Sequence, residues 1–227
     1  MNTSVLIYSC DKYSDVWRPF FTLFFRYWEC PYWVYLATET KKCRESGVMT
    51  INTEGTWTER MRKAVSQIET EYIIGMCEDF FFRRRVKQNI IDNCIAYMEA
   101  DRSIGCFNFE KEYEKGIELI PSEYLDFGQK PPGDHFQKSC QPTLWRRDYL
   151  EELLTGEMDA WHWEWQVRDY PLKHYIWNGL RDEMAFEYGL HHRSKFGIVQ
   201  GKWVKDDVGP LFEKERIDID LGKRGFV

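Results

Sequence analysis

Carboxylates recur where short apolar runs of the sequence give way to polar residues. Asp11, Glu39, Glu54 and the adjacent pair Glu78 and Asp79 all occupy such positions. Carboxylate oxygens are hard ligands of the kind that Mg²⁺ and Mn²⁺ prefer. Brought together by the fold, these residues would suit a ligand whose phosphates are neutralised by a divalent ion. The sequence therefore predicts binding of a phosphate-bearing ligand together with Mg²⁺ or Mn²⁺.

Glu164 is a further candidate because it lies among three tryptophans, Trp161, Trp163 and Trp165. Apolar surroundings disfavour the charged form of a carboxyl group and raise its pKa toward the range useful to a general base. Aromatic faces also stack against sugar rings. The alternative interpretation is that Glu164 faces solvent or forms an ion pair, and that the tryptophans belong to the core.

The loop motifs of two large classes of nucleotide-binding enzymes are missing. Ser9-Cys10-Asp11 follows the first predicted strand, where neither a G-x-G-x-x-G pattern nor a P-loop pattern occurs. This excludes a nicotinamide-dependent dehydrogenase and a P-loop ATPase. A net charge of −6 argues against a protein that mainly neutralises a nucleic acid backbone.

Cysteine usage and hydropathy predict the compartment. The seven cysteines include no C-x-x-C pair, which favours free thiols in a reducing environment. No apolar run approaches the ~20 residues that a bilayer span needs, and no signal-peptide pattern follows Met1. We expect a soluble, cytoplasmic protein without a transmembrane segment, and a peripheral position at a membrane stays open.

The first hundred residues alternate between strand-like and helix-like patterns. Thr56-x-x-Glu59 is a capping box and marks the clearest helix start. Strands that alternate with helices indicate crossover connections and a mainly parallel sheet covered on both faces. The predicted class is α/β, with the ligand in the crevice beyond the carboxyl ends of the strands. The predicted strands are 5–8, 33–36, 48–51, 72–77 and 104–109.

The pattern weakens after residue 110. Pro121 and Gly128 interrupt any long element, so residues 110–139 are predicted to be loop and irregular strand. Short helices are predicted from Arg146 to Leu154 and near residues 161–165, and the tail from Lys205 is charged and weakly patterned. No Ser/Gly-rich linker separates two units, which favours a single domain over 1–227, with a regular half (1–109) and a less regular half (110–227).

Several segments together resemble the bacterial glycosyltransferases of the GT-A fold, family-2-like, that build cell-surface polysaccharides. The resemblance extends from residue 4 to residue 205. The matching segments are V-L-I-Y-S-C-D-K-Y-S-D from Val5, W-T-E-R-M-R-K-A-V-S-Q-I from Trp57, Y-I-I-G-M-C-E-D-F-F-F from Tyr72, Q-P-T-L-W-R-R from Gln141, W-H-W-E from Trp161 and G-K-W from Gly201.

This resemblance implies a Rossmann-like GT-A fold and a hexosyltransferase-like activity. Residues 1–109 would bind a nucleotide-sugar donor, and residues 110–227 would bind the hydroxyl-bearing acceptor, a glycan or a lipid-linked glycan. The implied transfer inverts the anomeric centre. Its cofactor would be Mn²⁺ or Mg²⁺ bound at the diphosphate.

The resemblance also implies roles for individual residues. Glu78 and Asp79 would hold the metal ion and the diphosphate, although the sequence there reads Glu78-Asp79-Phe80 in place of Asp-x-Asp; the alternative is that this pair caps the following helix. Glu164 would be the base that takes the proton of the acceptor hydroxyl. The implied donor-binding residues are Ser9, Asp11, Thr38, Glu39, Arg60, Glu78 and Asp79, and the implied substrate-contacting residues are Trp145, Trp161, Trp163, Lys202 and Trp203.

Two other functions stay open at this stage. A sugar nucleotidyltransferase would share the fold type but would want a Gly-rich basic loop after the first strand, which Ser9-Cys10-Asp11 is not. A non-catalytic carbohydrate-binding protein would use the tryptophans as platforms, bind glycan without any nucleotide, and tolerate loss of Glu78 and Asp79.

Overall fold

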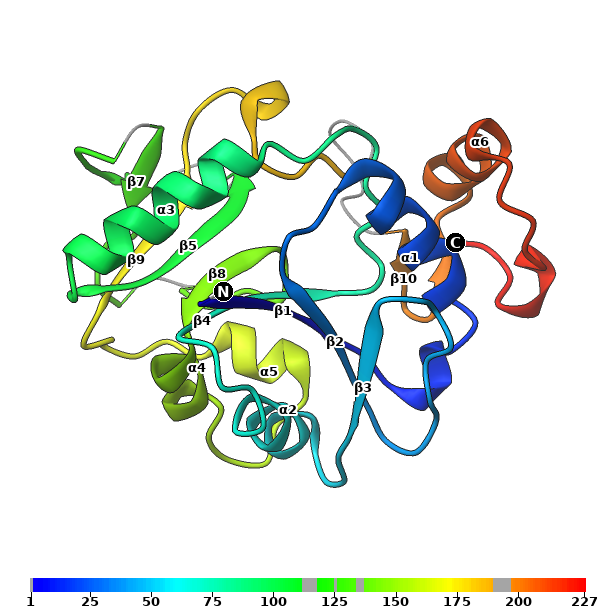
Figure 1. Ribbon diagram of the computed structural model, residues 1–227, viewed down its shortest axis with the longest axis horizontal. Coiled ribbons are helices and arrows are strands. Elements are labelled where there is room, and N and C mark those ends of the chain that lie inside the picture. Colours follow the sequence, from blue (N-terminus) through cyan, green and yellow to red (C-terminus); the bar gives the residue numbers. More distant parts are fainter. Residues whose placement is uncertain (1, 112–117, 125, 134–136, 190–196) are drawn as a thin grey trace.

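A nine-stranded sheet runs through the molecule in the order β3-β2-β1-β4-β8-β5-β9-β7-β6 (Figure 1). The structure is a computed structural model and describes residues 2–111, 118–124, 126–133, 137–189 and 197–227. The strands are β1 (Thr3–Tyr8), β2 (Trp33–Thr38), β3 (Val48–Asn52), β4 (Tyr72–Cys77), β5 (Ile104–Lys111), β6 (Ile120–Pro121), β7 (Phe127–Gln129), β8 (Thr143–Arg146) and β9 (Lys173–Trp177).

The sheet is mainly parallel, as predicted. β3, β2, β1 and β4 pair in parallel in the order 3-2-1-4, which is the order of a Rossmann-like nucleotide-binding half. β8 then pairs antiparallel with both β4 and β5, and β5 pairs in parallel with β9. The predicted α/β class is confirmed, and strands from both halves of the chain join one sheet.

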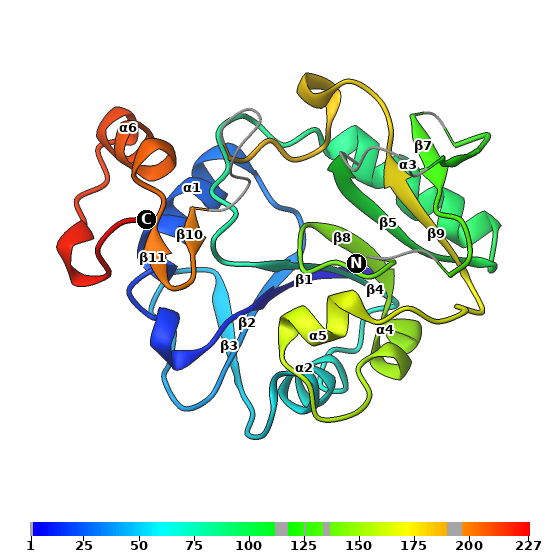
Figure 2. The ribbon, with the colours of Figure 1, turned by 180° about the vertical axis from the view of Figure 1, so that it is seen from behind.

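Helices cover both faces of this sheet, because successive side chains of a buried strand point to opposite sides. In β1, Val5 and Ile7 pack toward α1 (Trp17–Tyr27) and α3 (Gln88–Ala100), whereas Leu6 and Tyr8 face the opposite helices. Figures 1 and 2 show these two layers on either side of the strands. The opposite helices are α2 (Trp57–Val65), α4 (Arg147–Leu153) and α5 (Ala160–Trp165).

An aromatic cluster fills the core beneath α1. Phe20, Phe21 and Phe24 are buried on the inner face of that helix, and Phe24 stacks on Phe82, with 5.6 Å between the ring centroids. Trp28 meets Phe186 edge to face at 5.3 Å. Rings in these arrangements add to the stabilisation that burial of apolar area already gives. The cluster therefore fixes α1 against the segment that follows β4.

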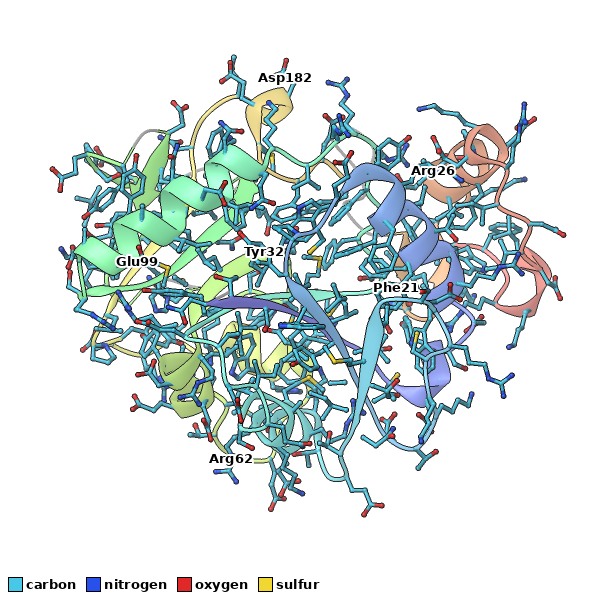
Figure 3. All side chains as sticks on the ribbon, in the orientation of Figure 1. Phe21, Arg26, Tyr32, Arg62, Glu99 and Asp182 are labelled. Carbon is cyan, nitrogen blue, oxygen red and sulfur yellow. The ribbon has the colours of Figure 1, made fainter. Side chains whose placement is uncertain are left out.

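α2 begins where the capping box predicts. The Thr56 side chain accepts from the backbone N–H of Glu59, and the Glu59 carboxylate accepts from the backbone N–H of Thr56 at 2.8 Å. The helix carries Arg60 on its buried side, and Arg62 on its exposed side, at the outer edge of the molecule in Figure 3. Only Arg60 is thus turned toward the strand ends.

The C-terminal segment differs from the expected weakly patterned tail. It forms a small ribbon of β10 (Ile198–Val199) and β11 (Lys202–Trp203), then α6 (Lys205–Glu215). Val208, Leu211 and Phe212 are buried, and Asp207 pairs with Arg83 at 2.6 Å. The apolar residues of α6 are few and stand among charged residues, so the sequence shows no clear helical periodicity there. Short 3-10 turns are η1 (Asp11–Tyr13), η2 (Arg181–Glu183) and η3 (Leu221–Lys223).

Among the described residues, no helix combines the length and the apolar character needed to cross a bilayer. Of the helices that the structure describes, α3 is the longest, with 13 residues. A helical span needs about 20 predominantly apolar residues.

Tyr8 packs directly against Gly75, and this contact offers a test of how the side chains pack on the sheet. A Cβ at Gly75 would lie 1.8 Å from the Tyr8 hydroxyl oxygen. We expect Gly75→Ala to lower the free energy of unfolding by ~1–3 kcal/mol, because the Tyr8 ring must move. Urea denaturation measures this. In a Tyr8→Ala background the same substitution should cost nothing further, and an equal cost in both backgrounds would contradict the explanation.

Candidate functional site

Three strand ends meet at one edge of the parallel part of the sheet, since β1 lies between β2 and β4. Ser9 joins two of them: its hydroxyl donates to Glu78 Oε1 at 2.6 Å and accepts from the indole N–H of Trp17 at 2.7 Å. Burial raises the pKa of Glu78 to about 8; the neighbouring Asp79 adds to this rise, and the bond from Ser9 opposes it. One carboxylate oxygen of Glu78 is therefore already hydrogen-bonded to a protein group, the Ser9 hydroxyl.

Asp79 has one carboxylate oxygen without a partner in the described part of this edge. Its Oδ1 is buried without a hydrogen-bond partner among the described residues. Burial raises the pKa of Asp79 to about 7, its own backbone N–H opposes the rise, and the nearby Glu164 adds to it. A buried acceptor without a donor is costly, and a bound cation would satisfy it.

The donor set fits a divalent ion that is shared with a substrate. Within the part of the chain that the structure describes, no group of three or more His, Cys, Asp and Glu side chains could hold a metal ion. The described side chains alone therefore do not supply a complete set of metal ligands. Mg²⁺ is commonly bound by one or two carboxylates plus substrate phosphates. Asp79, with the second oxygen of Glu78, suits this arrangement.

Asp11 fastens the loop after β2. Its Oδ1 accepts from the Thr38 hydroxyl at 2.8 Å and from the Lys41 backbone N–H at 3.0 Å, and its Oδ2 accepts from the Thr40 hydroxyl at 2.5 Å. Partial desolvation opposes ionisation, but the bonds from Thr40, Lys41 and Thr38 hold the pKa of Asp11 well below its usual range. Asp11 and Thr38 are therefore adjacent, as the sequence implied. Their polar atoms form hydrogen bonds that hold the loop after β2 in place.

Arg60 ties the same loop to the end of β1. The buried guanidinium donates from Nη1 to Glu39 Oε1 and from Nη2 to the carbonyl oxygen of Ser9. Glu39 Oε2 also accepts from the backbone N–H of Asp11 at 2.5 Å. Partial burial opposes ionisation of Glu39, but these donors hold its pKa below the usual value. All the donor-binding residues inferred from the sequence thus lie at one edge of the sheet.

Glu164 comes from the other half of the chain and reaches this edge through Cys140. The backbone N–H of Cys140 donates to Glu164 Oε1 at 2.5 Å, and its carbonyl accepts from the backbone N–H of Cys77, the last residue of β4, at 3.0 Å. Burial raises the pKa of Glu164 to about 7; the bond from Cys140 lowers it and nearby Glu110 raises it. Glu164 makes no ion pair with any described residue.

The tryptophans divide into core and surface. Trp145, Trp163 and Trp203 have no exposed area, so the expectation that they contact substrate is not met. They pack instead: Trp145 and Trp163 lie 6.2 Å apart between ring centroids, and Trp203 meets Phe212 edge to face. Trp161, in contrast, is 61% exposed.

Lys202 is exposed at the start of the two-residue strand β11. Its partner in the ribbon is Val199. Among the described residues, no contact joins the Lys202 side chain to the carboxylates of the site, so its inferred contact with the donor stays a prediction.

Sequence reasoning missed the segment from Gln137 to Cys140. This segment supplies the N–H group that holds Glu164, and it carries Lys138, whose side chain is buried. No periodicity marks these residues, because their burial depends on contacts with α5 and β9, which are remote in sequence. An isolated lysine in a loop is normally exposed, so composition gave no signal.

No protein-family model matches the chain, and no curated protein does either. Among solved structures, 2-C-methyl-D-erythritol 4-phosphate cytidylyltransferase from Thermus thermophilus is 14% identical, with 85% of this chain and 94% of that chain covered and a TM-score of 0.47. S. aureus TarS 1–349 in complex with UDP-GlcNAc is 10% identical, with 99% and 69% covered and a TM-score of 0.47.

A third similar structure is the bifunctional IspDF from Campylobacter jejuni, at 11% identity and a TM-score of 0.45. The alignment covers 82% of this chain and 52% of that chain, so this chain spans about half the length of that protein. These are similarities of fold at low identity. The fold class itself follows from the strand order and the two helix layers.

The buried carboxyl groups predict a particular pH dependence of stability. The pKa of Glu164 is about 7 in the folded chain against 4.5 ordinarily, so between these values the native state holds a proton that the unfolded state has released. Raising the pH from 5 to 8 should therefore destabilise wild type relative to Glu164→Gln. We expect a change on the order of 1 kcal/mol, measured by urea denaturation.

Glu152→Gln is the matched control, since Glu152 is exposed on α4. Its stability relative to wild type should stay constant over the same pH range. A constant difference for Glu164→Gln would show that Glu164 titrates like an ordinary surface carboxylate.

Proposed function

We propose that this protein is a glycosyltransferase that moves a sugar from a nucleotide-sugar donor to a hydroxyl group of a glycan or of a lipid-linked glycan. The proposal depends chiefly on one observation. Asp79 and Glu164 are two partly buried carboxylates whose pKa values are raised to about 7 at the carboxyl ends of the parallel strands, and both lie near Cys140, since each raises the pKa of its thiol. Carboxyl groups whose pKa values are strongly raised by burial are typical of functional sites.

The donor side of the reaction is supported by the polar strand ends. Open α/β sheets bind ligands in the crevice beyond the carboxyl ends of their strands. The loop held by Asp11, Glu39 and Arg60 would border the base and ribose, and the diphosphate would lie against Asp79 and Glu78. Mg²⁺ or Mn²⁺ held there would offset the negative charge of the diphosphate leaving group.

Glu164 would act as the general base on the acceptor side. A neutral hydroxyl is a poor nucleophile, so Glu164 would take its proton while the oxygen attacks the anomeric carbon. The bond between that carbon and the diphosphate oxygen breaks, and its electron pair leaves with the diphosphate. A base with a pKa near the working pH combines a high ionised fraction with useful basicity. The exposed ring of Trp161, three residues before Glu164, would stack on the acceptor sugar.

The donor class is tested by thermal shift. We expect one of UDP-, GDP-, CMP- and dTDP-sugars, with Mn²⁺, to raise the melting temperature, since a ligand at a hundred times its Kd stabilises by about 2.7 kcal/mol. Asp79→Asn should abolish the Mn²⁺-dependent part of this shift. Asp218→Asn, at an exposed position, is the control.

The same screen separates the proposal from its rivals. CTP and UTP are included, and a shift with a free nucleoside triphosphate but with no nucleotide sugar would indicate a nucleotidyltransferase. Stabilisation by glycans alone, unchanged in Asp79→Asn, would indicate a non-catalytic carbohydrate-binding protein.

Glu164→Gln tests the catalytic assignment. The amide keeps the size of the side chain and can still accept from the Cys140 N–H, but it cannot take a proton. We expect transfer from the donor found in the screen to fall by at least ~100-fold, with the donor-induced thermal shift preserved. Nucleotide release reports the rate, and Glu152→Gln should stay at the wild-type rate. Unchanged turnover in Glu164→Gln would refute this role.

A further inference from the structure

Lys138 is a fully buried lysine between β7 and β8. Its Nζ donates to Gln166 Oε1 at 2.6 Å and lies 4.7 Å from the centre of the Trp163 ring. Within the described residues it forms no ion pair. Burial lowers the pKa of Lys138 to about 7; Arg168 contributes to this, and Cys140 and Glu164 oppose it. A buried amine without a counter-ion is costly, so its polar and aromatic contacts have to hold it.

The partners of Lys138 lie on both sides of the candidate base. Trp163 precedes Glu164 directly, and Gln166 follows it by two residues at the end of α5. The next residues of the lysine's own segment, Ser139 and Cys140, bond to the Glu164 carboxylate. Residues 138–140 and 163–166 are therefore joined through Lys138 and through Glu164 itself.

A residue of β9 also holds the backbone next to Lys138. His174 Nδ1 lies 2.7 Å from the carbonyl oxygen of Gln137, and its Nε2 lies 2.8 Å from the Tyr149 hydroxyl. Burial lowers the pKa of His174 to about 3, so the ring is neutral. A neutral ring facing a carbonyl must donate from Nδ1, and Nε2 then accepts from Tyr149. The bond from His174 thus fixes the backbone at Gln137, the residue before Lys138.

We propose that Lys138 is a positioning residue for Glu164 in the transfer reaction proposed above. Its ammonium group holds α5 against residues 138–140, and this keeps the Glu164 carboxylate on the Cys140 N–H and directed toward the end of β4. The positive charge also favours the ionised form of Glu164, which is the form that accepts a proton. This inference rests on the proposed function for its catalytic consequence, whereas its structural part can be measured independently.

The direct test is amide hydrogen exchange at Cys140, whose N–H bonds to Glu164. Lys138→Met keeps the length of the side chain and removes the charge. We expect exchange at Cys140 to become at least tenfold faster, and nucleotide release from the donor sugar found in the screen to lose at least tenfold in kcat, with the donor KM within about twofold. Lys173→Met, on the exposed start of β9, should leave both unchanged.

Substitutions of Gln166 make the test specific to the contact between Lys138 and Gln166. They also provide a second route to the same measurement if the Lys138→Met variant does not fold. Gln166→Met removes the acceptor and should reproduce the faster exchange, whereas Gln166→Glu keeps an acceptor and should keep the protection. The double variant of Lys138→Met and Gln166→Met should be no worse than either single variant, since both remove one interaction.

Two outcomes overturn the inference: unchanged Cys140 exchange in Lys138→Met or in Gln166→Met, or full additivity in the double variant. Failure of the proposed function looks different. In that case no nucleotide sugar stabilises the protein, or Glu164→Gln turns over normally, while the exchange at Cys140 still responds to Lys138.

Discussion

The insertion of β8 between β4 and β5 is the constraint on which the candidate site depends. β8 runs antiparallel to β4, so the segment before it reaches the carboxyl end of β4, where Cys77 bonds to Cys140. That one contact brings the less regular half of the chain to the edge built by β1, β2 and β4. Without it, Glu164 would have no reason to lie near Asp79, because the two residues are 85 positions apart in sequence.

The site concentrates groups that the rest of the fold must stabilise. Glu78, Asp79 and Glu164 each favour the protonated form more than usual, and Lys138 is buried without an ion pair among the described residues. Such groups cost stability, and the two apolar layers packed on the sheet offset that cost. A bound phosphate-bearing ligand with its metal ion would relieve part of it. The arrangement is therefore better suited to binding than to holding the fold together.

Local signals in the sequence predicted the regular half of the fold well. The strands of β1 to β5 and the start of α2 follow from apolar runs and a capping box, which depend on neighbouring residues alone. β8, β9 and α6 were missed, since their patterns are short and their burial depends on distant partners. The polar strand ends were placed together correctly because parallel strands share one carboxyl edge.

The tryptophans show why residue type alone could not separate buried rings from exposed ones. Trp161 and Trp163 are two positions apart on a short helix, so they point in different directions: Trp163 packs under Lys138, and Trp161 faces solvent. One turn of α5 therefore carries both a ring that is buried in the core and a ring that is exposed to solvent. Glu164 lies between them and takes its orientation from the buried side. The orientation of Glu164 thus comes from core packing and from the loop at Cys140, and the exposed side of α5 is the side that an acceptor would meet under the proposed function.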